Sequence, residues 1–364
     1  LKRFFADNSA GFVFSYKLLT FSPRAGITYQ EQTLLSHISN EENNKENMAA
    51  TEFANDISTR STKAYVSSDI EFKSNKLTVK ESISMSTNKV NIADQKTDTK
   101  QQTTQFLISS KLSSGYKFNG FWRLTGSWHY DERLSTNDEF YSGFIMKNYR
   151  SLSQNIVSPF TVPTHKLSSR LEYRNQIISF FNTFDYIYSV SRFENTSNNL
   201  IADDGSSVII TQNMPKTSSS HYMQFYTSKF ISKTKTTFNL RVNYIQQQGK
   251  SLVNNVLFNT KNHTLNIRPE LSWRITPWMN LDYALNTNSV STFINQQKKS
   301  RISLLKHNIG FFIFPVKNQL ISLNAEYYNH NSTDFLFVDV LYRYTFTQRK
   351  IDLELKCNNI FNTS

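Results

Sequence analysis

Apolar and polar residues alternate along most of this chain with a period of two, which is the pattern of a β-strand with two unlike faces. Between Ile351 and Cys357 every second residue is apolar, and the residues between them are charged. Similar alternation occurs at 64–72, 118–130, 238–244, 264–275, 279–286, 321–328 and 336–346. About fifteen such segments can be counted, and no segment has a convincing amphipathic-helix pattern. The chain is therefore predicted to be all-β.

The predicted strands are long, and the links between them differ in length. Many alternating segments run for about 10 to 15 residues. They are long enough to cross a membrane, because a tilted transmembrane strand needs about 9 to 11 residues. Short turns, as near Ser74–Lys76, alternate with longer polar links, which are Asn91 to Gln102, Asp131 to Pro163, Glu194 to Lys216 and Gln246 to Asn259 among others. This asymmetry is typical of outer-membrane barrels. We predict a transmembrane antiparallel outer-membrane β-barrel with about 15–16 strands present, short periplasmic turns and long extracellular loops.

Composition agrees with a wall that has only one face in lipid. Hydrophobic residues are 38% of the chain, yet aromatic residues are 14%. Aromatics such as Phe118, Tyr130 and Trp273 lie near the ends of apolar faces, as in the aromatic girdles of membrane barrels. A soluble β-rich surface-binding protein is the alternative, but sandwich strands are shorter. We expect an integral protein of the bacterial cell outer membrane.

The formal net charge is +13, but the charges are spread singly and do not form basic runs. We therefore expect no nucleic-acid partner. The alternation predicts that one set of charges faces the lumen: Arg123, Arg170, Arg241, Arg268, Arg274, Arg343, Glu270 and Asp339. They could form an interior that favours anionic solutes, or they could be charge pairs that solvate the lumen. The second reading is favoured.

No segment of the sequence has the pattern of a catalytic or metal site. His129, in the stretch SWHYDER, is the most enzyme-like position, but no GxSxG motif is present to pair a serine with it. The seven histidines make no HxH or HxxxH pair, and Cys357 is the single cysteine, so neither ligand spacing of a zinc site is present. We predict a non-enzyme with no catalytic residues, no metal and no cofactor.

The loop from Asp131 to Pro163 is the first candidate for recognition of a ligand. Loops on a rigid scaffold commonly carry binding residues. This loop is polar and contains four aromatic residues that we take as candidate extracellular ligand contacts: Phe140, Tyr141, Phe144 and Tyr149.

The last 26 residues, DVLYRYTFTQRKIDLELKCNNIFNTS (Asp339 to Ser364), resemble the penultimate barrel hairpin of TonB-dependent outer-membrane receptors. The family motif is matched by Asn359, Ile360, Phe361 and Asn362. The stretch TFSPRAGITYQEQ (Thr20 to Gln32) also looks like barrel strands of these receptors. Specific residues of the resemblance thus cover a small part of the chain, whereas the general barrel pattern covers most of it.

The resemblance implies a barrel of 22 strands, so 1–364 would be one barrel domain truncated at both ends, with the plug domain absent. It implies energised uptake of a scarce solute that the sequence does not identify. The expected partners are outer-membrane lipid, a TonB complex, the protein's own plug domain in the full-length protein and, as a further candidate, a surface lipoprotein. The alternative is a passive porin-like channel of about 16 strands with a water-filled lumen.

Overall fold

The computed structural model describes residues 2–42, 45–48, 51–135, 140–155, 158–330, 333–348 and 350–361. The regular structure within these ranges is β-strand, apart from the short 3-10 turn η1 (Thr51–Phe53). None of the described residues belongs to a helix that is long and apolar enough to cross a membrane. Asn362 of the Asn-Ile-Phe-Asn motif lies outside the described residues.

Sixteen strands of 7 to 21 residues form one antiparallel sheet, which we call the wall. They are β1 (Lys2–Gly11), β3 (Leu19–Ser36), β6 (Asn55–Lys73), β7 (Leu77–Asp94), β8 (Thr99–Lys117), β9 (Trp122–Leu134), β12 (Thr161–Asn175), β13 (Phe180–Phe193), β16 (Lys216–Ile231), β17 (Thr236–Val253), β18 (Val256–Thr276), β19 (Met279–Ile294), β20 (Gln297–Ile313), β21 (Gln319–His330), β22 (Thr333–Phe346) and β23 (Ile351–Cys357). The predicted all-β class and the predicted number of strands are confirmed.

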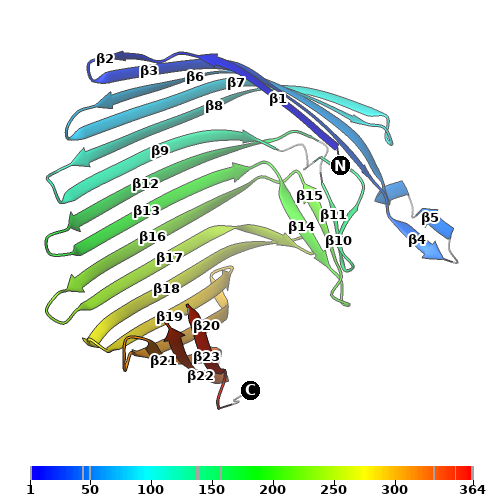
Figure 1. The fold of residues 1–364 in the computed structure, drawn as a ribbon. Helices are drawn as coiled ribbons and strands as arrows, with labels where there is room; N and C mark the ends of the chain where they lie inside the picture. Colours follow the sequence, from blue (N-terminus) through cyan, green and yellow to red (C-terminus); the bar gives the residue numbers. More distant parts are fainter. Residues whose placement is uncertain are drawn as a thin grey trace.

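Each wall strand pairs with the next wall strand along the chain, so the sheet is a continuous meander (Figure 1). The short strand β2 (Phe14–Tyr16) follows β1 and pairs with the same partner, β3. A separate hairpin of β4 (Ser39–Glu42) and β5 (Lys45–Met48) lies in the link between β3 and β6. Among the described residues β1 pairs with β3 alone and β23 with β22 alone, so the curved wall is not closed.

The register places an apolar row along one face of the wall. Directly opposed residues of antiparallel strands point to the same side of the sheet. A row of this kind crosses five neighbouring strands through Leu124, Leu171, Phe184, Phe225 and Val242. The first four are between 37% and 43% exposed. A contiguous exposed apolar surface of this extent requires an apolar environment, and we call this side the outward face.

The opposite face is polar and lies on the inside of the curve. Ser127 and Ser168, on neighbouring strands, are hydrogen-bonded across it at 2.7 Å. Short strands from the two long loops lie within the curve (Figure 1). Ile145, from the first of these loops, packs against a small apolar cluster that includes Ile57, Val90 and Ile92 of the inner face. The inner face therefore lines the lumen side of the wall.

Two links that the sequence predicts as loops are hairpins instead. Most of 91–102 belongs to β7 and β8, which are joined by a turn at 95–98. Most of 246–259 belongs to β17 and β18, joined by Asn254 and Asn255. Both of these asparagines have positive φ, 48° and 63°, as a two-residue type I′ turn requires. The polar residues that suggested loops are strand residues in hairpins that extend beyond the apolar row.

Candidate functional site

The two longest loops fold into a second small layer on the inner side of the wall. It consists of β10 (Ile145–Asn148), β11 (Ser151–Gln154), β14 (Thr196–Ile201) and β15 (Ser207–Gln212), and we call it the loop sheet. The β10–β11 hairpin joins β15 through parallel pairing of β11. β15 pairs with β14, and β14 pairs in parallel with wall strand β17. Figure 1 shows these strands inside the curve, at the loop ends of the wall strands.

One end of the loop sheet is fastened to β6 and β7. The Gly143 N–H donates to Asn55 Oδ1 at 2.7 Å, and Asn55 Nδ2 donates to the Gly143 carbonyl at 3.3 Å. Ser142 Oγ donates to Asp94 Oδ2 at 2.7 Å. A Cβ at position 143 would lie 2.4 Å from the carbonyl oxygen of Ala54, so only glycine permits this approach of the two backbones.

A small apolar core supports this attachment. Phe140 is 1% exposed and packs with Tyr141 against Ile57, Val90 and Ile92 on the inner face of β6 and β7. The Tyr141 hydroxyl is hydrogen-bonded to Ser153 at 3.1 Å. Both aromatics thus anchor the loop within the protein.

The prediction that all four loop aromatics contact an external ligand does not hold for Phe140 and Tyr141, because both are buried. Phe144 packs against Phe53 with the ring centroids 5.8 Å apart. Tyr149 is 84% exposed, with the Arg150 guanidinium 5.3 Å from the centre of its ring. Of the four aromatics, Tyr149 is the one that presents most of its surface to solvent.

The other end of the loop sheet is fastened to the β17–β18 turn. Asn198, which is 0% exposed, donates from Nδ2 to Asn255 Oδ1 at 2.7 Å and accepts from the Asn255 N–H at 3.3 Å. The Ile201 N–H donates to Asn254 Oδ1 at 2.7 Å. Both ends of the layer are therefore held by an asparagine side chain that bonds a distant backbone group.

The turn between β14 and β15 is held by local hydrogen bonds. Gly205 has φ +80°, a backbone conformation that favours glycine. Asp204 Oδ1 accepts from Ser206 Oγ at 2.7 Å and from the Ser206 N–H at 2.8 Å. The hydrogen bond from the Ser206 hydroxyl has the largest effect and the one from the Ser206 N–H the next largest. Together they hold the pKa of Asp204 below its ordinary value.

The loop sheet spans a large part of the inside of the wall. Its two attachments lie on β6–β7 and on β17, and five wall strands (β8, β9, β12, β13 and β16) lie between them in pairing order. Because both ends of the loop sheet are attached to the wall, the sheet occupies part of the space enclosed by the inner face. The two loops thus obstruct part of the lumen.

A cavity of about 590 Å³ lies between the loop sheet and the inner face of β13, β16, β17 and β18. Hydroxyl and amide side chains dominate its lining, including Ser191, Ser218 and Asn262. Its charged residues are Arg133, Lys216 and Lys250, and no carboxylate is among the described residues that line it.

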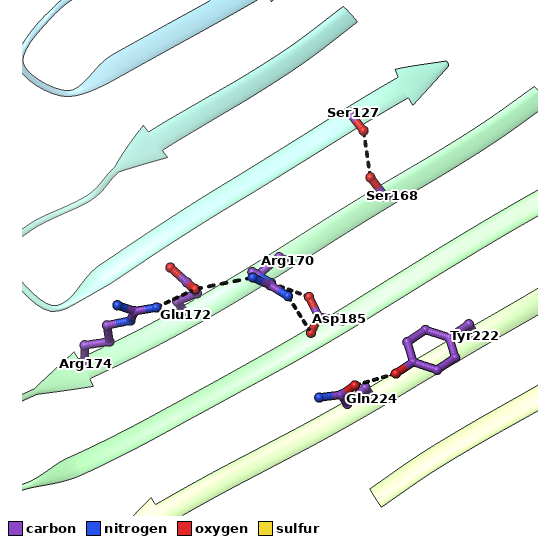
Figure 2. A network of polar contacts seen from close by, with 8 residues as sticks. All are labelled: Ser127, Ser168, Arg170, Glu172, Arg174, Asp185, Tyr222 and Gln224. Carbon is purple, nitrogen blue, oxygen red and sulfur yellow. Dashed lines mark hydrogen bonds and ion pairs between the residues drawn. The ribbon is translucent and has the colours of Figure 1, made fainter. Parts of the chain in front are cut away.

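Charged residues on the inner face of β12 and β13, outside this cavity, form ion pairs with one another (Figure 2). Arg170 Nη2 donates to Asp185 Oδ2 at 3.2 Å, and its Nη1 lies 3.9 Å from Glu172 Oε1. Glu172 Oε1 also accepts from Arg174 at 3.0 Å. Arg123, Arg170 and Asp185 line a second cavity of about 440 Å³. This cavity has a carboxylate of its own.

The register places all eight predicted lumen charges on the inner face. Ion pairs join Arg268 to Glu270 and Arg343 to Glu354, each at 2.6 Å. The others have different neighbours: the Arg241 guanidinium lies 5.7 Å from the Tyr226 ring centre, Arg274 donates to the Pro277 carbonyl at 3.3 Å, and Asp339 accepts from the Asn359 N–H at 2.8 Å. Most of these charges therefore serve contacts within the wall.

The Asn359–Phe361 part of the C-terminal motif continues from β23 and turns back onto β22. Its backbone is held by the bond from Asn359 to Asp339 and by the Ile360 N–H, which donates to the Val338 carbonyl at 2.9 Å. The motif thus has a structural contact with the neighbouring strand.

Histidines that are far apart in the sequence recur beside tyrosines on the outward face. No group of three or more potential metal ligands occurs within the described ranges. Each of four histidines has a tyrosine partner instead, and in three pairs the hydroxyl is hydrogen-bonded to the imidazole Nδ1: Tyr186–His221 at 3.1 Å, Tyr244–His263 at 2.6 Å and Tyr283–His307 at 2.9 Å, with the Tyr130 and His165 rings 4.8 Å apart.

Comparison with known proteins gives weak similarity to outer-membrane transporters. No protein-family model matches the chain, and no curated protein matches it. The solved structure of the outer membrane transporter YddB from Escherichia coli is similar with a TM-score of 0.33 and 9% identity, over 99% of this chain and 72% of that one. The ferric-catecholate import receptor Fiu from E. coli K12 gives 0.31 and 10%, over 99% and 69%.

A third solved structure, P. aeruginosa FpvA bound to heterologous pyoverdines, gives a TM-score of 0.31 and 12% identity, over 99% of this chain and 61% of that one. Likeness at this level assigns no activity. The class of the protein follows from its own structure, through strand length, the exposed apolar face and the polar inner face. These features define the wall of an outer-membrane-type antiparallel β-barrel.

Proposed function

We propose that this chain is the barrel portion of a TonB-dependent-receptor-like protein, which takes up a scarce solute across the bacterial outer membrane at the expense of energy. The observation that carries the proposal is the unclosed wall of sixteen strands. Lipid does not tolerate unpaired strand edges, so the edges of β1 and β23 need partner strands. A barrel larger than sixteen strands supplies them.

A passive porin-like channel of about sixteen strands is the less favoured reading. It would require β1 to pair with β23, and the described residues contain no such pairing. The fixed loop sheet across the inner side also fits gated uptake better than a wide aqueous passage. A soluble surface-binding protein is disfavoured because the row through Leu124, Leu171 and Phe184 would be exposed to water.

The proposal assigns partners to the parts of the wall. Outer-membrane lipid covers the outward face, and a plug domain of the full-length protein fills the space inside the inner face. A TonB complex acts on that plug from the short-turn side. The loop side is where solute arrives and where a surface lipoprotein would dock.

The experiment is a conductance measurement on the full-length protein, purified from its native membrane and inserted into planar bilayers. A plugged receptor gives no steady open-channel current, and it is cross-linked to the periplasmic domain of TonB by a photoreactive probe. A steady current of the size given by porins, without TonB cross-linking, would overturn the proposal in favour of the passive channel.

A further inference from the structure

The cavity under the loop sheet differs in charge balance from the rest of the inner face. Several cations along the wall have acidic partners, as Arg170 has Asp185 and Arg268 has Glu270. In the cavity, the register places Arg133 of β9 and Lys216 of β16 on the inner face, and Lys250 of β17 is also among the lining residues. None of the described lining residues is acidic. This cavity is therefore a local site of positive potential.

From this contrast we propose that the cavity binds an anionic, hydroxyl-rich solute of the sugar-acid class. The proposal rests on the proposed function, since it names the substrate class of the same barrel. Arg133 and Lys216 would hold the acidic group, because charge-assisted hydrogen bonds to a carboxylate are the stronger ones. The serine hydroxyls and the asparagine and glutamine amides would bind the hydroxyl groups.

The polar lining also points to a ligand that donates hydrogen bonds. The hydroxyls of Ser191 and Ser218 and the amides of Gln247 and Asn262 line the cavity, and their oxygens are hydrogen-bond acceptors. A bare inorganic anion cannot donate a hydrogen bond to these oxygens, whereas a sugar hydroxyl can. The combination of cations with an acceptor therefore selects a ligand that carries both an acidic group and hydroxyls.

Two further features agree with a bound polar small molecule. The volume of about 590 Å³ lies within the range of about 300 to 1,000 Å³ for small-molecule sites. The Lys216 ammonium lies 5.7 Å from the centre of the Phe193 ring. This contact does not neutralise the charge of the lysine, because the ring carries no net charge.

The test is isothermal titration calorimetry on the full-length protein in lipid nanodiscs, with digalacturonate as the probe and neutral galactobiose as its matched comparison. The proposal predicts that digalacturonate binds at least about tenfold tighter than galactobiose. Arg133→Gln and Lys216→Gln should each weaken binding of the acid by about tenfold, since one charged hydrogen bond contributes on that order. Lys299→Gln, at an exposed residue of β20, should leave the affinity unchanged.

Equal affinity for the two disaccharides, no binding of either, or equal affinity in the cavity variants and in Lys299→Gln would overturn the proposal. Each variant is shown to be folded if its unheated sample migrates differently from its heated sample on a denaturing gel, as the wild-type barrel does. The two proposals fail separately. A steady bilayer current contradicts energised uptake whatever the calorimetry gives, and loss of acid selectivity in a protein with no current contradicts the substrate class alone.

Discussion

Asn55 and Gly143 form a reciprocal pair of hydrogen bonds across 88 positions of sequence. The Gly143 N–H donates to the Asn55 amide oxygen at 2.7 Å, and the Asn55 amide nitrogen donates to the Gly143 carbonyl at 3.3 Å. Asn55 is 1% exposed. The side chain of Asn55, at the start of β6, therefore satisfies both backbone groups of the loop residue Gly143. It fixes the loop sheet to the wall.

Asn55→Ala should release this end of the loop sheet without unfolding the wall. The change leaves a buried N–H and a buried carbonyl without partners, which costs roughly 1–3 kcal/mol. Hydrogen–deuterium exchange in lipid nanodiscs should therefore become faster in residues 140–155 and stay unchanged in 236–276. As a control, Asn308→Ala removes an inner-face amide whose Oδ1 has no hydrogen-bond partner among the described residues. Unchanged exchange in 140–155 would show that the Asn55 side chain does not hold the loop sheet on the wall.

Phe140→Ala should destabilise the loop sheet more than any change at Tyr149. Phe140 is enclosed by Ile57, Val90 and Ile92, and truncation of a buried phenylalanine costs about 3–5 kcal/mol. Limited proteolysis should then cut within 140–155. Tyr149→Ala, at a side chain 84% exposed, should give the wild-type pattern. Equal resistance of both variants would contradict the anchoring role of Phe140.

Arg170 and Asp185 should be energetically coupled. The Asp185 side chain is 12% exposed and that of Arg170 is 52% exposed. Solvent around the guanidinium weakens the pair, so a coupling of about 1 kcal/mol is expected from a double-mutant cycle of alanine variants refolded into lipid vesicles. The more exposed pair of Arg60 and Glu31, at 62% and 34%, should couple less. If the coupling energy of Arg170 and Asp185 is no larger than that of Arg60 and Glu31, the ion pair on the inner face does not stabilise the wall.

Leu265→Arg should destabilise the protein in a bilayer more than Thr264→Arg does. Leu265 is on the outward face and 38% exposed, whereas the neighbouring Thr264 points to the inner face. Arginine on the lipid face of a barrel costs about 2–4 kcal/mol near the midplane. Denaturant titrations in vesicles measure both variants. A larger loss for Thr264→Arg would reverse the assignment of the two faces.

The period of two was enough to predict which face each wall residue occupies. Arg268 and Glu270 are two positions apart on β18, so a strand must place both on one side, and the register adds only the identity of their neighbours. The sequence also predicted the two long loops in which the loop sheet occurs. Strand alternation is a local property, and for that reason it can be read without knowledge of the fold.

The loop sheet could not be predicted, because it depends on contacts between distant segments. Nothing near Asn55 distinguishes it from the many other asparagines of the chain. Phe140 and Tyr141 looked like exposed aromatics in a polar loop, and only the return of that loop onto Ile57 and Val90 buries them. The cavity residues Arg133, Lys216 and Lys250 come from three separate strands, so no local motif identified them.

The central claim is that the wall has one lipid-facing side and one lumen-facing side. The most direct test is a nitroxide scan of β18 from Leu265 to Leu271 in the full-length protein in lipid vesicles, with Cys357 replaced by serine. Collision with oxygen should be high at 265, 267 and 271 and low at 266, 268 and 270, and a water-soluble nickel chelate should give the opposite pattern. A chelate that reached both sets equally would contradict the barrel wall.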